Sequence, residues 1–180
     1  MRMRFACLFG IAVTGVANVN ANAPTPTKLS PCETADHRAF DFWVGEWVVT
    51  RADTGAQVAE SRIEKLYAGC AIRENWMPTG GTGGGSVNAY DPQTRLWGQI
   101  WVDSSGAWVD FSGGVVDKAV VLTGLWRNYV APGKDALIRM TYRKQDDGSV
   151  SQRGEQSTDY GKSWSIAFVF LYRPKSGKTP

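Results

Sequence analysis

The sequence predicts an all-β protein, an antiparallel up-and-down barrel of about ten strands that follows a short N-terminal helical turn. Glycine and tryptophan are frequent, at 20 and 8 of the 180 residues, and this composition suits a compact sheet with tight turns and aromatic faces. Turn-forming sequences recur at short intervals, and no long stretch has the pattern of a crossover helix. Barrel closure would remove exposed strand edges, and a two-sheet sandwich is the alternative.

Residues 1–21 are predicted to be a secretory signal peptide. A basic start is followed by a nearly continuous apolar run over residues 5–17 and then by small polar residues, the three parts of such a signal. Small residues before Ala21 indicate cleavage after it. A membrane anchor is the alternative, but the run of about 13 residues is shorter than the roughly 20 of a spanning helix. We expect a periplasmic or secreted protein without stable membrane insertion after cleavage.

The mature chain is expected to hold one domain. Residues 22–31 are proline-containing and predict an extended leader, and residues 32–180 form a single β-barrel domain. Loss of Arg2 and Arg4 with the signal leaves 18 basic and 17 acidic residues, a net charge of +1. This near-neutral balance gives no reason to expect a nucleic-acid partner. The sequence does not indicate an oligomeric state.

Two cysteines remain after signal cleavage, because Cys7 lies within the signal. An even number of cysteines in an oxidising compartment usually forms a bridge. We therefore predict a Cys32–Cys70 disulfide that ties the N-terminal segment to the sheet. Zinc binding or a nucleophilic thiol is the alternative, although His37 is the one histidine in the chain.

The elements follow in order along the mature chain. Residues 32–42 predict a short helical turn with Phe40 and Phe42 facing inward. Alternating apolar and polar residues then predict strands, joined by turns rich in Asp and Gly. The strands are expected at residues 46–52, 57–67, 71–77, 85–90, 95–102, 107–112, 115–122, 125–129, 136–144, 150–157 and 163–172. Consecutive hairpins make them an antiparallel meander.

Polar and aromatic side chains share one face of two neighbouring predicted strands, on either side of the turn at residues 91–94. These residues are Ser86, Asn88, Tyr90, Trp97, Gln99 and Trp101. We expect them to point into a common cavity, because binding pockets combine apolar walls with a few polar groups. The sequence thus predicts binding of a small aromatic or apolar molecule, with no cofactor and no metal site.

The alternative is a cofactor-independent isomerase, hydratase or lyase acting in the same cavity. Glu74 or Glu155 would be the catalytic acid or base, since an apolar environment raises the pKa of a carboxyl group. Asn88 and Gln99 would stabilise a developing oxyanion. The structural alternative is that such a glutamate pairs with an arginine, for which Arg139 and Arg153 are candidates.

Residues 40–47 read Phe-Asp-Phe-Trp-Val-Gly-Glu-Trp. The Gly45-x-Trp47 pattern after a helical turn resembles the opening of lipocalin-like, or calycin-type, barrels. The resemblance implies that an arginine of a late strand, here Arg173, lies over Trp47 in a cation–π contact. The chain is also similar to an uncharacterised family of secreted bacterial proteins that share this opening. Its other shared segments are Gly-Cys at residues 69–70, Ser-Val-Asn-Ala-Tyr-Asp at residues 86–91 and Trp-Gly-Gln-Ile-Trp-Val-Asp at residues 97–103.

Overall fold

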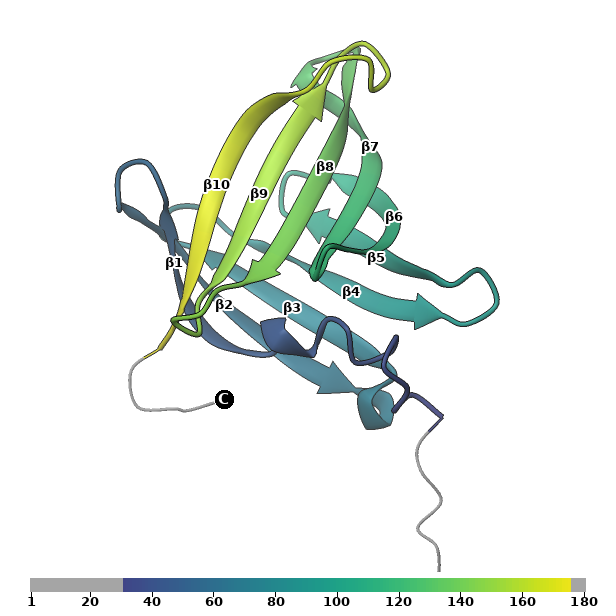
Figure 1. The fold of residues 1–180 in the computed structure, drawn as a ribbon. Helices are drawn as coiled ribbons and strands as arrows, with labels where there is room; N and C mark the ends of the chain where they lie inside the picture. The colour runs from purple at the N-terminus through teal and green to yellow at the C-terminus, as the bar shows by residue number, and fades with distance from the viewer. Residues whose placement is uncertain (1–30, 176–180) are drawn as a thin grey trace, which may run out of the picture.

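Ten antiparallel strands close into a barrel in the computed structural model, which describes residues 31–175 (Figure 1). They are β1 (Gly45–Arg51), β2 (Gln57–Leu66), β3 (Ala71–Pro78), β4 (Gly84–Asp91), β5 (Leu96–Asp103), β6 (Trp108–Val116), β7 (Ala119–Ala131), β8 (Lys134–Lys144), β9 (Val150–Ser157) and β10 (Ser165–Pro174). Each strand pairs with its neighbours in sequence, and β1 pairs with β10 to complete the barrel. The predicted up-and-down barrel is confirmed over the sandwich.

Two single turns of 3-10 helix, η1 (Asp41–Trp43) and η2 (Tyr67–Gly69), are the helical elements of residues 31–175. No helix in this part of the chain is both long and apolar enough to cross a bilayer. The predicted signal peptide, residues 1–21, lies outside the described residues, as does the predicted leader except for its last residue.

The hairpin between β6 and β7 differs from the prediction. The sequence predicted strands at residues 115–122 and 125–129, whereas the chain reverses inside the first of these ranges. Asp117 and Lys118 form the turn with φ angles of 48° and 63°, the left-handed pair that a two-residue type I′ hairpin requires. After this turn, one long strand, β7 (Ala119–Ala131), takes the place of the two predicted strands.

Alternation along β5 places side chains as the sequence predicted. Trp97 and Gln99 are buried inside the barrel, and Trp101 is half-buried on the same face. Ile100 and Val102 are exposed on the outer face. Because successive strand residues point to opposite faces, this register fixes the inward stripe of β5.

Strand β10 departs from strict alternation. Strict alternation along the strand predicted at residues 163–172 would place Ile166, Phe168, Phe170 and Tyr172 on one face, but the pairing of β10 with β9 shifts register between Ile166 and Phe168. Such a bulge inserts one extra residue and changes which side chain points inward. Ile166 is accordingly 56% exposed, while Phe168 and Phe170 line the interior.

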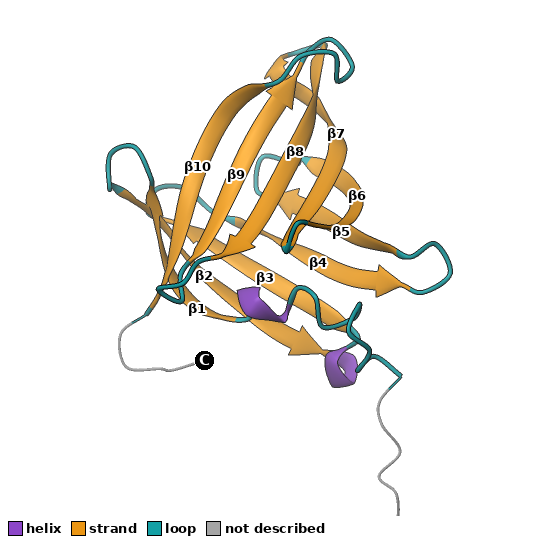
Figure 2. Cartoon of the chain, viewed as in Figure 1, coloured by secondary structure: helices purple, strands orange, loops and turns teal. Residues whose placement is uncertain are grey.

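The N-terminal segment closes one end of the barrel, where η1 lies across the strand ends (Figure 2). The predicted Cys32–Cys70 disulfide is present and ties this segment to the residue before β3. Phe40 and Trp43 are fully buried, and their rings stack with centroids 4.8 Å apart. We call these two side chains the N-terminal plug.

The contact that the lipocalin resemblance implied for Arg173 does not form. Trp47 packs edge-on against Tyr172, with ring centroids 6.3 Å apart, and its indole N–H donates to the Trp43 carbonyl at 2.9 Å. Arg173 is exposed and donates to the Thr50 hydroxyl at 2.8 Å. Since Tyr172 points inward, its neighbour Arg173 points to the outer face, away from Trp47.

Candidate functional site

The barrel interior beyond the plug holds a cavity of about 200 Å³. The plug and the cavity lie at successive levels along β5. This strand runs from Trp97, beside the plug residue Phe40, to Trp101, which lines the cavity. Six aromatic side chains from β3, β5, β7 and β10 line the cavity. We call them the aromatic wall: Trp76, Trp101, Trp126, Tyr129, Phe168 and Phe170.

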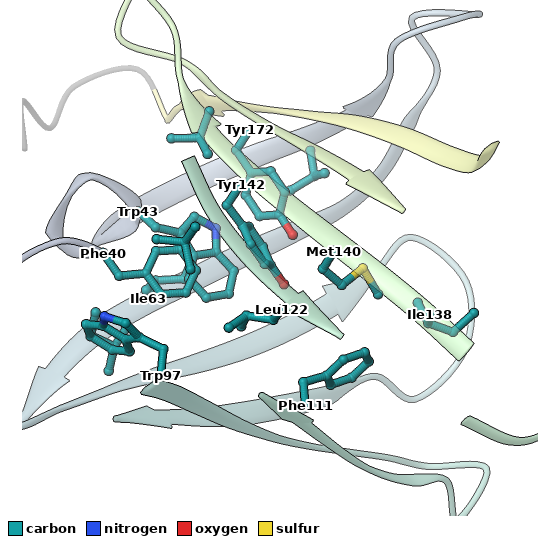
Figure 3. Close-up of a cluster of buried hydrophobic side chains, with 14 of the residues drawn as sticks. Phe40, Trp43, Ile63, Trp97, Phe111, Leu122, Ile138, Met140, Tyr142 and Tyr172 are labelled. Carbon is teal, nitrogen blue, oxygen red and sulfur yellow. The ribbon is translucent and has the colours of Figure 1, made fainter. Parts of the chain in front are cut away.

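A ring of hydrogen-bonded polar side chains crosses the interior between the plug and the cavity. We call it the polar belt, and its members are Glu74, Ser86, Asn88, Gln99, Tyr142, Gln152 and Tyr172. Tyr142 marks the boundary, because its ring lies 4.9 Å from that of Phe40 and the residue also lines the cavity. Figure 3 shows Phe40 and Trp43 on one side of Tyr142 and Met140 on the other.

One half of the belt surrounds the Glu74 carboxyl group. Ser61 donates to its Oε1 at 3.0 Å, and Ser86 donates to its Oε2 at 3.3 Å. The Asn88 amide donates to Ser86 Oγ at 3.0 Å and to the Ile72 carbonyl at 3.1 Å. Both N–H groups of Asn88 are therefore used in holding this half of the belt together.

The other half of the belt joins two glutamines to two tyrosines. Gln99 Nε2 donates to Asn88 Oδ1 at 2.7 Å and to the Tyr142 hydroxyl at 3.4 Å. Gln152 Nε2 donates to the same hydroxyl at 3.1 Å. Tyr172 donates to Gln152 Oε1 at 2.7 Å, and its oxygen lies 3.4 Å from Glu74 Oε1, which closes the ring.

Burial raises the pKa of Glu74 from its ordinary 4.5 to about 7, although hydrogen bonds from Ser61, Ser86 and Tyr172 oppose the shift. No ion pair within residues 31–175 includes this carboxyl group. Glu74 can thus gain or lose a proton near neutral pH.

Tyr142 offers a donor to the cavity. Its oxygen accepts from Gln99 and Gln152, but its own O–H has no acceptor among the described residues. Burial, with the nearby Glu74 charge, raises the pKa of Tyr142 above its ordinary value, so the hydroxyl keeps its proton at neutral pH. A ligand oxygen or nitrogen in the cavity can therefore accept a hydrogen bond from Tyr142.

Four of the six predicted ligand-binding residues meet at this site. Gln99 and Trp101 line the cavity, and Trp101 is oriented by a hydrogen bond from its indole N–H to Asp103 at 3.1 Å. Ser86 and Asn88 are buried in the polar belt beneath it. Their hydrogen bonds fix Glu74 and Gln99, so these two residues position the groups that face the cavity.

The other two predicted residues, Tyr90 and Trp97, lie at the plugged end. The Tyr90 hydroxyl donates to the Asp36 carboxylate at 3.2 Å, and the Trp97 indole donates to the Asp36 carbonyl at 3.1 Å. Neither residue lines the cavity. They share the inward stripe of their strands, but the N-terminal segment occupies the space that they face.

The two candidate carboxyl groups occupy opposite sides of the barrel wall. Glu74 lines the cavity, whereas Glu155 lies on the outer face and accepts hydrogen bonds at 2.9 Å from both Arg139 and Arg153. Burial favours a higher pKa for Glu155, but the two arginines outweigh it and lower the pKa below its ordinary value. The structural alternative of arginine pairing thus describes Glu155, and Glu74 alone of the two faces the cavity.

Several cavity residues were not predicted from the sequence. Trp76 shares an inward face with Glu74 on β3, so strict alternation from Glu74 could have identified it. Trp126 and Tyr129 come from β7, whose course was not predicted correctly, and their rings lie 5.4 Å apart. Gln152 was missed because β9 carries few apolar residues to mark its inward face.

No protein-family model matches the chain, and a search of curated proteins finds no match. The closed ten-strand antiparallel barrel of residues 31–175 is consistent with a calycin-like barrel.

Proposed function

We propose that the protein is a secreted or periplasmic binding barrel of the lipocalin-like type that takes up a small aromatic or otherwise apolar molecule. One observation carries this proposal: the cavity of about 200 Å³ is walled by aromatic rings and floored by hydrogen-bonding groups. Apolar walls bind by excluding water, and a few polar groups orient the ligand. Tyr142 and Gln99 are the polar groups suited to that role.

The size of the cavity limits the size of the ligand. Pockets for drug-sized molecules usually measure roughly 300–1,000 Å³, and an apolar cavity of about 150 Å³ in another protein accepts benzene. A cavity of about 200 Å³ therefore suits a molecule with one ring or two fused rings. A flat ring can stack against Trp76 or Phe170, which are themselves parallel within 27°.

The export proposal is supported by the signal-like sequence of residues 1–21 and by the Cys32–Cys70 disulfide. Disulfides persist mainly in oxidising compartments such as the periplasm and the extracellular space. A carrier or sensor of small molecules outside the cytoplasm fits both features.

Calorimetric titration with indole tests the binding proposal. Trp76→Ala removes a ring of the aromatic wall, and we expect it to weaken binding by about tenfold. Trp108→Ala is the matched control, because Trp108 is 64% exposed on the outer face and should leave the affinity unchanged. Absence of saturable binding of indole, naphthalene and p-cresol to the wild-type protein would overturn the proposal, as would an equal loss in both variants.

A second candidate function is the cofactor-independent isomerase, hydratase or lyase, which the environment of Glu74 favours. A carboxyl group with a pKa of about 7 is suited to proton transfer at neutral pH. The amide N–H groups of Asn88 and Gln99 are used within the belt, so Tyr142 is the donor for an oxyanion. Glu74→Gln separates the two candidates, because it abolishes turnover by an enzyme but leaves the affinity of a neutral ligand unchanged.

A further inference from the structure

Glu74 is a carboxyl group in an aromatic cavity without a positive partner. Its oxygens accept hydrogen bonds from the hydroxyls of Ser61, Ser86 and Tyr172. The residues that line the cavity include no Lys, Arg or His. An ionised carboxylate in such a place is costly unless a cation neutralises it. The described residues supply none, so the cation would have to come with the ligand.

The aromatic wall is also suited to binding a cation. The faces of aromatic rings carry partial negative charge and attract cations, Trp most strongly. Trp76 and Phe170 stack with centroids 5.7 Å apart, and Phe168 and Phe170 with centroids 4.4 Å apart. Trp76 lies two residues from Glu74 on the inward face of β3. A carboxylate and electron-rich ring faces thus line one small cavity.

We infer that the preferred ligand of this cavity is a small organic cation, an amine or quaternary ammonium compound, whose charge is neutralised by Glu74. This inference rests on the proposed function, since it names the chemical class that the binding cavity takes. It goes beyond that function, because an apolar cavity alone would favour neutral molecules.

Binding of such a cation should displace a proton. Glu74 is partly protonated at neutral pH in the empty cavity, and a cation favours its ionised form. The titratable groups that face Glu74 are Tyr142 from β8 and Tyr172 from β10, and burial raises the pKa of both. Glu74 is therefore the group in the cavity that titrates near neutrality, and its carboxyl proton passes to solvent as the cation binds.

Two probes of nearly equal shape test the inference: phenyltrimethylammonium and its neutral isostere tert-butylbenzene. Quenching of tryptophan fluorescence in the full mature protein measures the affinity of each. At about pH 8 we expect the cation to bind about tenfold more tightly than the isostere. Its affinity should fall about tenfold towards pH 5.5, whereas that of tert-butylbenzene should stay constant.

Glu74→Gln should remove the preference for the cation and keep the affinity for tert-butylbenzene. Glu155→Gln, which removes a carboxyl group from the outer face, is the matched control and should behave as wild type. Equal or tighter binding of tert-butylbenzene to the wild-type protein overturns the inference and leaves the proposed function intact. Failure of both probes to bind overturns the proposed function. If Glu74→Gln does not fold, the wild-type pH dependence and the isostere comparison decide.

Discussion

At the scale of single residues, the barrel wall gives two glutamates opposite properties. Glu74 faces the interior, where loss of water dominates and raises its pKa to about 7. Glu155 faces outward, where Arg139 and Arg153 hydrogen-bond to it and lower its pKa despite partial burial. Both residues are glutamates, so their neighbours decide whether the carboxyl group is protonated near neutral pH or is ionised in ion pairs.

Replacement of Glu74 by Gln should change how stability depends on pH. The folded protein holds the Glu74 proton up to about pH 7, whereas the unfolded chain releases it near 4.5. The wild-type protein therefore loses stability as the pH rises through this window, by about 3 kcal/mol in total. Gln cannot ionise. In urea denaturation, the free energy of unfolding of Glu74→Gln relative to wild type should therefore rise between pH 4.5 and about pH 8.

Glu155→Gln is the control with the opposite sign. Because the folded-state pKa of Glu155 is lowered, its stabilising effect is present at neutral pH and is lost as the pH falls through the folded-state pKa. The advantage of wild type over Glu155→Gln should therefore shrink in acid. A Glu74→Gln variant whose stability follows wild type at every pH would contradict a buried, titrating Glu74.

At the scale of elements, β9 and β10 shape the cavity through a close approach of backbone to ring. A Cβ atom at Gly154 would lie 2.4 Å from the Phe168 ring, so the glycine allows that ring to lie over β9. Phe168 in turn stacks on Phe170, with centroids 4.4 Å apart. The bulge after Ile166 brings both rings to the interior.

Gly154→Ala should destabilise the barrel by about 1–3 kcal/mol, because the added methyl group displaces the Phe168 ring. Gly98→Ala on β5 is the matched control, since nothing lies within 4 Å of a Cβ atom there. That change should stabilise the protein by about 0.5–1 kcal/mol, as expected for Gly to Ala in a strand. Thermal unfolding of both variants gives the comparison, and equal effects would contradict the packing of Phe168 over Gly154.

The fold could be predicted from local patterns, and the misses occurred where pairing or distant packing decides. Alternation identified the inward face of β5, including Gln99 and Trp101. The turn at Asp117 and Lys118 lacks the glycine that usually marks a type I′ hairpin, so it was not recognised. The bulge in β10 arises from register with β9, which the sequence of β10 alone does not record.

The site was predicted in part for the same reason. Strand alternation shows which face a residue shares, and it grouped Tyr90 and Trp97 with Gln99. It does not show which end of the barrel is filled. The contacts of Tyr90 and Trp97 with Asp36 join segments more than 50 residues apart, and such packing depends on the whole fold.

At the scale of the whole molecule, the barrel interior has three layers: the N-terminal plug, the polar belt and the aromatic cavity. The N-terminal segment that carries the plug is covalently attached to the barrel through the Cys32–Cys70 disulfide. The ring of Trp43 in the plug packs on that of Tyr142 in the belt, with centroids 4.8 Å apart. The belt in turn holds the groups that face the cavity. The disulfide thus supports the site indirectly, by holding its base in place.

Loss of the disulfide should lower stability and loosen the plug. The bridge joins residues 38 apart, and closure of such a loop stabilises a folded protein by about 4 kcal/mol in the chain-entropy description. Cys32→Ser/Cys70→Ser should therefore unfold at a lower urea concentration than wild type. Dithiothreitol should reproduce this shift in wild type and leave the double variant unchanged; coincident unfolding curves for all samples would contradict the structural role of the bridge.

In the proposed function, the cavity above the polar belt takes up a small aromatic molecule. X-ray diffraction from crystals soaked in iodobenzene tests this most directly, because anomalous scattering locates the iodine without prior assumptions. We expect an iodine peak inside the barrel, among Trp76, Trp101 and Phe168. Iodine found solely on the outer face, for example beside Trp108, or nowhere on the protein, would contradict it.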